Sequence, residues 1–138
     1  MMELVERPSE TLWDQRRDWL AEREARYAEG GAGRLSEQAA ALAVDLERVF
    51  CAGAWAACVV LAGAIVDAQA YHAGFPQHAR REEESWLRGL RNRLMHAQAS
   101  QPAITMEDQW LRGPEWERSA KRACDLALEA LYVWGRKR

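Results

Sequence analysis

A long uncharged segment is the strongest constraint on how this chain folds. Residues 49–66 contain no Asp, Glu, Lys or Arg, and roughly 18 apolar residues are enough to cross a membrane as a helix. Much of the segment is Ala and Gly, however, and these residues gain little free energy on transfer into lipid. We therefore expect no membrane span. The segment instead predicts a central helix, over about residues 54–73, that is buried by its neighbours.

The composition around this segment favours helix throughout. The chain has 138 residues, of which 49% are hydrophobic, enough for one domain with its own core. Ala, Leu, Glu and Arg are abundant, whereas the strand-forming residues Thr and Ile are few. No internal repeat or low-complexity linker divides the sequence. We expect one all-α domain that spans residues 1–138.

Serine caps place the first two helices. Ser9 is the expected N-cap of a helix over about residues 9–30, which ends at Gly30 and Gly31. Ser36 opens a second helix that ends at about residue 52. The apolar residues of the first helix form only a narrow stripe: Leu12, Trp13, Trp19, Leu20 and Tyr27. We therefore expect this helix to lie on a surface or on a partner.

A charged fourth helix follows the turn predicted around Gly74 and Pro76. It begins at Gln77 or Arg80 and ends at about Ala99, before the next proline. The Arg-Arg-Glu-Glu-Glu sequence at residues 80–84 predicts ion pairs within this helix. The next segment, through residues 105 and 110, is expected to be the longest irregular part of the chain.

Pro114 suits the first turn of a last helix, whose apolar residues recur at three- and four-residue steps as far as Trp134. With short connections between them, these helices predict a four- to five-helix antiparallel bundle.

Seven Trp against two Phe is an unusual aromatic composition. Trp86 and Trp134 fall on the apolar faces of the fourth and last helices, so we expect them in the core. Trp13 and Trp19 lie on the narrow stripe of the first helix, where an intermolecular interface is the simpler explanation. Stacking on RNA bases is the alternative function for Trp13, Trp19, Trp86 and Trp116.

Charge and cysteine content exclude several classes. A net charge of −2 argues against a broad basic surface for nucleic acid. Cys51, Cys58 and Cys124 lie in apolar helical sequence, so we expect buried thiols, with neither a disulfide framework nor a metal site. No cofactor is expected. Residues 1–7 contain no apolar signal segment, which predicts a cytoplasmic protein.

One segment of the fourth helix carries suggestive polar residues. Arg91 is followed directly by Asn92 and, five residues on, by His96. On an ideal helix Asn92 and His96 lie about 40° apart, nearly opposite the apolar arc, and so point away from the core. Residues 88–106 contain no acidic residue. The segment is therefore a local basic patch, in which Arg88 and Arg93 are candidates to bind phosphate.

These residue types suit RNA cleavage without a metal. A histidine can take a proton from a ribose 2′-hydroxyl or give one to a leaving oxygen, and an arginine stabilises charge on the phosphate oxygens. Asn92 is expected to hold a phosphate or to fix the tautomer of His96. Arg91 and His96 are roughly 140° apart on one helix, so a single copy cannot aim both at one target. A symmetric dimer can, and we therefore expect a homodimer that meets through this motif helix.

The sequence Arg91-Asn92-Arg93-Leu94-Met95-His96, late in a helical bundle, resembles the motif of the HEPN (higher eukaryotes and prokaryotes nucleotide-binding) domain family. The resemblance covers about residues 36–134 and leaves the first helix as an addition. It implies a dimeric all-α domain and, in many members, a metal-independent endoribonuclease used as a toxin or in antiviral defence. Arg91 and His96 would then be the catalytic pair and Asn92 the supporting polar residue.

Two other functions are compatible with the sequence. The same fold and face could serve a non-catalytic module that dimerises or holds a partner, such as a nucleotidyltransferase-type antitoxin. Alternatively, the chain is an unrelated helical protein with a solvated polar face. Asp67, at the polar end of the central helix, either hydrogen-bonds toward the motif helix or stays solvated. The sequence alone favours the solvated carboxylate.

Overall fold

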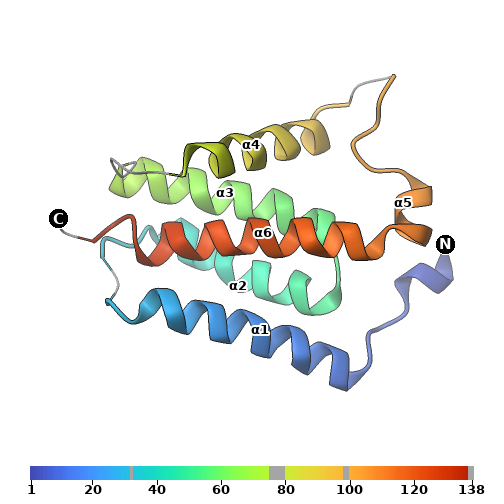
Figure 1. Cartoon of the computed structure of the whole chain (residues 1–138), viewed down its shortest axis with the longest axis horizontal. Helices are drawn as coiled ribbons and strands as arrows, with labels where there is room; N and C mark the ends of the chain where they lie inside the picture. The colour runs from blue at the N-terminus through green and yellow to red at the C-terminus, as the bar shows by residue number, and fades with distance from the viewer. Residues whose placement is uncertain (32, 75–79, 98–99, 137–138) are drawn as a thin grey trace.

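The computed structural model is helical throughout the parts that it describes, residues 1–31, 33–74, 80–97 and 100–136 (Figure 1). The elements in chain order are a 3₁₀ turn at Met2–Val5, then α1 (Glu10–Ala28), α2 (Glu37–Ala52), α3 (Trp55–Ala73), α4 (Arg81–Met95), α5 (Met106–Leu111) and α6 (Gly113–Tyr132). No strand occurs within these ranges. The prediction of an all-α helical bundle is confirmed.

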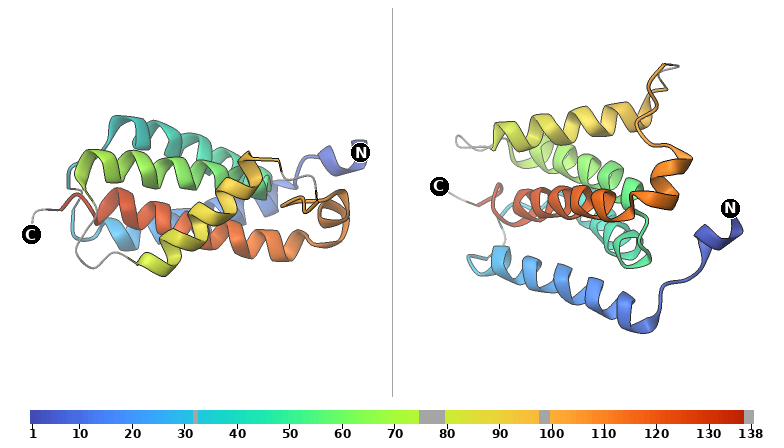
Figure 2. Two further views of the ribbon diagram at one scale, coloured as in Figure 1. Left: turned by 90° about the horizontal axis from the view of Figure 1, so that it is seen from above. Right: turned by 45° about the vertical axis from the view of Figure 1, so that its right-hand side comes forward.

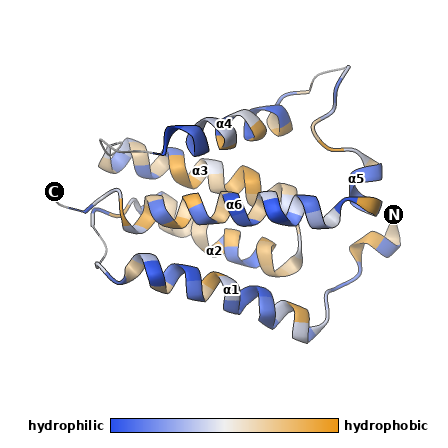
Figure 3. Cartoon of the chain, viewed as in Figure 1, coloured by the Kyte–Doolittle hydropathy of each residue, from blue (hydrophilic) through white to orange (hydrophobic). Residues whose placement is uncertain are grey.

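Helix α3 is the centre of the bundle, as the uncharged segment predicts. It packs along α6, α2 and α4, and it is the most hydrophobic helix in Figure 3. By length and composition α3 could also cross a membrane, but 44% of its most apolar window is buried inside the chain, and core helices pass the same test. Small residues on it, such as Ala62 and Gly63, are fully covered and let neighbouring helices approach closely.

Local capping explains why the first helices begin and end where they do. The Ser9 hydroxyl accepts a hydrogen bond from the Leu12 N–H (3.1 Å), and the Ser36 hydroxyl accepts one from the Ala39 N–H (3.2 Å). Gly53 ends α2 with a left-handed backbone, φ 81°. These boundaries agree with the sequence predictions.

Two predictions on the C-terminal side of α3 are wrong. Helix α4 begins at Arg81, close to one of the two predicted starts, but it ends at Met95 rather than at Ala99, which lies outside the described residues together with Pro76 and Gln77. The segment predicted to be irregular contains the short helix α5. There the Thr105 hydroxyl accepts from the Asp108 N–H, and the Asp108 carboxylate accepts from the Thr105 N–H.

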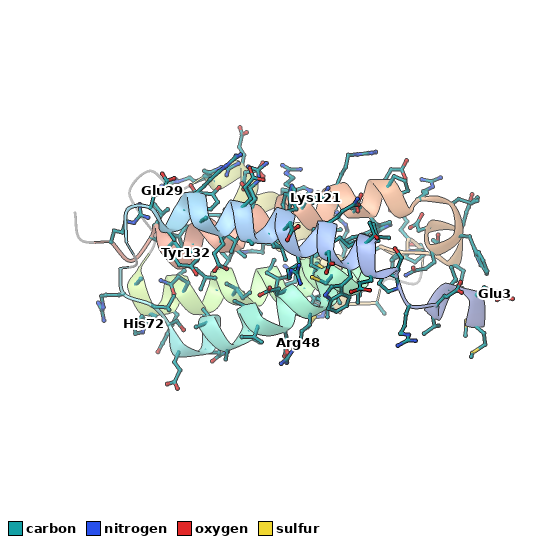
Figure 4. The ribbon with its side chains drawn as sticks, turned by 90° about the horizontal axis from the view of Figure 1, so that it is seen from below. Glu3, Glu29, Arg48, His72, Lys121 and Tyr132 are labelled. Atoms are coloured by element: carbon teal, nitrogen blue, oxygen red, sulfur yellow. The ribbon has the colours of Figure 1, made fainter. Side chains whose placement is uncertain are left out.

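Helix α1 packs within its own chain, against α2 and α6. Trp19 stacks on Phe50 with ring centroids 5.3 Å apart, while Arg23 and Lys121 each lie 5.3 Å from its ring. Figure 4 shows Lys121 beside α1. The predicted intermolecular contact is therefore wrong for Trp19, because its ring packs on Phe50 and is covered by cationic side chains of the same molecule. Trp13 remains 37% exposed.

The residues that follow α6 form a backbone hydrogen bond with the connection between α1 and α2. The Arg34 N–H donates to the Gly135 carbonyl at 2.8 Å, and the two backbones lie so close that a Cβ at Gly33 would be 2.0 Å from the Gly135 carbonyl carbon. The fully buried Gln69 of α3 fixes the same place. It accepts from the Ser36 N–H (2.9 Å) and donates to the Arg34 carbonyl (2.6 Å).

Candidate functional site

The motif lies on α4, which crosses the bundle obliquely (Figure 2). Its Leu87 and Leu90 side chains are buried against the core, and Trp86 and Leu94 pack beside them. The sequence predicts an apolar arc formed by Trp86, Leu87, Leu90, Leu94 and Ala97, and the structure confirms it as far as Leu94, whereas Ala97 is exposed and lies beyond the helix. The polar residues of the motif therefore occupy the other sides of α4.

Arg91 lies against the central helix. Its aliphatic stem occupies the space left by Gly63, where an added Cβ would be only 2.5 Å from the Arg91 Cδ. The Arg91 Nη1 donates to the Asp67 carboxylate, and Nη2 donates to the Asn92 Oδ1 at 3.4 Å. Only 22% of the Arg91 side chain is exposed. The guanidinium is thus held in one place by residues of α3 and α4.

Asp67 is the residue whose role the sequence misjudged. Its carboxylate makes the ion pair with Arg91 rather than remaining solvated, although 48% of the side chain is exposed. The contact depends on the distance between α3 and α4, which Gly63 permits, so neither helix alone indicates it. Asp45 of α2, in contrast, pairs with Arg48 on its own helix at 3.0 Å.

His96 is not part of this cluster. It is the residue after the last turn of α4, with extended backbone (φ −116°, ψ 116°), and its N–H donates to the Asn92 carbonyl. Its exposed side chain makes no hydrogen bond or ion pair with any residue that the structure describes. Helical-wheel geometry therefore does not apply to His96, but its predicted exposure, and that of Asn92, is confirmed.

The basic patch is partly neutralised by neighbouring acids. Arg88 and Arg93 are exposed, as expected for phosphate-binding candidates. Glu84 lies with Arg88, Arg91 and Asp67 around a small hollow between α3 and α4. Burial raises the pKa of Glu84, an effect that the positive charge of Arg88 opposes. The absence of acids within residues 88–106 therefore overstates the local positive charge, since Asp67 and Glu84 come from outside that segment.

An open groove on α3 adjoins Arg91. It has a volume of about 530 Å³, and Ala64 and Ala68 are among the residues that line it. Further lining residues come from the start of α2, from α3 and from α4: Ser36, Gln38, Asp67, Tyr71, His72 and Arg91. Figure 4 shows His72 near the end of the bundle at which α3 terminates. The sequence did not single out Tyr71, which is 96% exposed.

Residues at the start of α4 form their shortest ion pairs with α6. Glu83 accepts two hydrogen bonds from Arg122, at 2.8 and 2.6 Å, and this contact with α6 lowers the pKa of the Glu83 carboxyl group. Arg80 lies 3.4 Å from Asp125 of α6 and 3.8 Å from Glu83. The predicted ion pair within residues 80–84 is present between Arg80 and Glu83, but the shorter contacts join α4 to α6 and hold the motif helix in place.

Asp125 also joins α1 to this network. It accepts a hydrogen bond from the Tyr27 hydroxyl at 3.0 Å. Burial, reinforced by this bond and by the negative charge of Asp125, raises the pKa of Tyr27 to about 12.

No group of three potential metal ligands occurs within the described parts of the chain. Cys51, Cys58 and Cys124 are buried free thiols, as predicted. A hydrogen bond with the Cys58 thiol, reinforced by burial, raises the pKa of Cys124. Of the other two histidines, His72 is exposed and lines the groove beside Arg91, and His78 lies outside the described residues.

Comparison with known proteins found no matching family model, curated protein or solved structure. The resemblance to HEPN domains therefore rests on the motif and the helical bundle alone.

Proposed function

We propose that this chain is a HEPN-like, metal-independent endoribonuclease of the toxin or defence type, acting as a homodimer in the cytoplasm. The observation that carries the proposal is the fixed position of Arg91. An arginine stem packed against a glycine of the central helix, with its guanidinium bound by Asp67 and Asn92, is preorganised at an exposed edge of the bundle. Preorganised donors are what stabilisation of a phosphorane-like transition state requires.

His96 would supply the proton transfer. Its exposed imidazole would take the proton from a 2′-hydroxyl, whose oxygen attacks the adjacent phosphorus and forms a 2′,3′-cyclic phosphate, while the displaced 5′-oxygen takes a proton from water and leaves as a 5′-hydroxyl. Arg91 would stabilise the charge on the phosphate oxygens, with Asn92 beside it and Arg88 and Arg93 holding neighbouring phosphates. Because Arg91 turns toward α3 whereas His96 extends beyond the end of α4, we infer that the Arg91 of one copy acts with the His96 of a second copy.

Cleavage of a labelled RNA in the presence of EDTA tests the proposal. We expect wild type to cleave, His96→Ala and Arg91→Ala to lose at least 100-fold in rate, and Arg48→Ala, an exposed arginine on α2, to retain the wild-type rate. Intact RNA with wild type would refute the proposal. So would activity that depends on His72 but not on His96.

One observation favours a second candidate, a non-catalytic binding module. Arg91 is already paired with Asp67, and this reduces its attraction for a phosphate. In that case the motif face would bind a second copy or a partner such as a nucleotidyltransferase-type antitoxin. Expression of the wild type discriminates the two: growth arrest that Arg91→Ala abolishes supports the nuclease, and harmless expression together with intact RNA supports the binding module.

A further inference from the structure

Tyr71 is exposed to an unusual degree for an aromatic residue on a central helix. Its relative exposure is 96%, compared with 37% for Trp13 and 52% for Trp110. It lies in the last full turn of α3, a helix whose other faces are covered by α2, α4 and α6. Its hydroxyl and ring have no hydrogen-bond or ring partner among the described residues. The folded monomer therefore gains nothing from the aromatic ring at this position.

The ring adjoins the motif residue on which the proposed function depends. Tyr71 and Arg91 line the same open groove, and Asp67, which binds Arg91, is one helical turn from Tyr71. Four residues along a helix correspond to roughly 6 Å, so the backbone of Tyr71 lies one turn beyond the point at which Arg91 contacts α3. The small side chains of Ala64 and Ala68 leave the space between the two residues open.

The groove also contains the polar groups that a nucleotide needs. Arg91 has five N–H donors and gives only part of them to Asp67 and Asn92. The exposed Gln38 side chain, from the first turn of α2, also lines the groove, and its amide offers both a hydrogen-bond donor and an acceptor. An aromatic face beside an arginine and an amide is the combination that binds unpaired bases.

We propose that Tyr71 is a base-stacking subsite, on which an unpaired nucleobase lies while the adjoining phosphate contacts Arg91. This inference rests on the proposed function, because it assumes that RNA is the ligand of the motif face. It adds a residue outside the motif and a structural requirement: the base on Tyr71 must be free of a pairing partner. A duplex would keep that base within its stack and could not use the subsite.

Binding of a fluorescein-labelled 12-nucleotide single-stranded RNA, followed by fluorescence anisotropy, tests the subsite. All proteins carry His96→Ala so that the probe is not cut. Loss of base stacking in Tyr71→Ala is expected to weaken binding between about 5-fold and 100-fold. Tyr71→Phe retains the ring and should stay within twofold of the parent. Trp110→Ala removes a comparably exposed aromatic from α5 and is the matched control, also expected within twofold. The same oligonucleotide annealed to its complement should bind equally well with and without Tyr71→Ala.

Four results would overturn the inference: no binding by the parent, an unchanged affinity in Tyr71→Ala, an equal loss in Tyr71→Phe, or dissociation of a dimer by Tyr71→Ala in sedimentation velocity. The last result would make Tyr71 an interface residue instead. Cleavage by the His96-containing protein, measured in parallel, separates this inference from the proposed function. Binding that depends on Tyr71 without any cleavage would refute the nuclease and leave the subsite. Cleavage with an unchanged KM in Tyr71→Ala would refute the subsite and leave the nuclease.

Discussion

The packing of Arg91 on Gly63 makes a prediction that does not depend on function. In Gly63→Ala, the new Cβ would lie 2.5 Å from the Arg91 Cδ and 3.3 Å from its Cγ, so the arginine stem must move. Glycine in a helix interior is about 1 kcal/mol less favourable than alanine. The substitution therefore combines a stabilising effect on α3 with a destabilising clash against α4.

The two effects separate when Arg91 is removed. In an Arg91→Ala background the obstructing stem is absent, and Gly63→Ala should raise the free energy of unfolding by about 0.5–1 kcal/mol. With Arg91 present, crowding of this kind costs about 1–3 kcal/mol, so the net effect should lie between neutral and about 2 kcal/mol destabilising. The expected coupling between the two positions is thus about 1–3 kcal/mol.

Urea unfolding of the four proteins in this cycle measures the coupling. Gly89→Ala is the matched control, because a Cβ at Gly89 on α4 would meet only the Arg93 Nη1, at an ordinary 3.6 Å. It should stabilise the protein by about 0.5–1 kcal/mol whether or not Arg91 is present. Additive effects of Gly63→Ala and Arg91→Ala, within about 0.3 kcal/mol, would refute the proposed packing of Arg91. In the nuclease assay, Gly63→Ala should lower activity even if stability is unchanged, since it displaces the guanidinium.

Three further predictions concern stability and reactivity. Gln69→Leu removes the hydrogen bonds of the buried Ser36 N–H and of the partly buried Arg34 carbonyl and should destabilise the fold by about 1–3 kcal/mol in chemical unfolding; an unchanged free energy of unfolding would contradict these contacts. The hydrogen bonds from Arg122 lower the pKa of the Glu83 carboxyl group in the folded protein. The ion pair therefore stabilises the fold fully above the pKa of Glu83 in the unfolded chain, near 4.5, and this stabilisation is lost as the pH falls through the lower pKa of the folded state. Wild type should therefore exceed Glu83→Gln in unfolding free energy by about 1 kcal/mol at pH 7 and by less at pH 3, whereas a constant difference would argue against the ion pair. Cys124, fully buried and with a raised pKa, should not react with a disulfide thiol reagent until the protein is denatured; rapid native reaction would contradict its burial.

The helix boundaries set by capping are predicted correctly, because a cap depends on residues that are close together in the sequence. Ser9 and Ser36 cap α1 and α2, and Gly53 ends α2, because capping uses hydrogen bonds between residues only a few positions apart. The same kind of signal is present at Thr105, with Asp108 three residues later. It was missed because α5 has six residues, too few for a helical period to show in the pattern of apolar residues.

Features that depend on the spacing between helices could not be read from the sequence. The exposure of Asn92 follows from its place opposite the apolar arc of α4, but the Arg91–Asp67 pair requires the close approach that Gly63 allows. Likewise, the apolar stripe on α1 is narrow in the sequence because part of its cover comes from elsewhere in the chain. Lys121, about a hundred positions away, lies over the ring of Trp19. Long cationic side chains cover apolar surface that a count of apolar residues leaves unexplained.

The position of α6 has a consequence for how the protein acquires its structure during synthesis. This helix packs against α1, α2, α3, α4 and α5, yet it is made after all of them. Until it leaves the ribosome, the apolar surface of α3 lacks its main cover, and the joint between Arg34 and Gly135 cannot close. Domains generally fold as units, so a nascent chain that still lacks α6 should remain open and should need protection by chaperones.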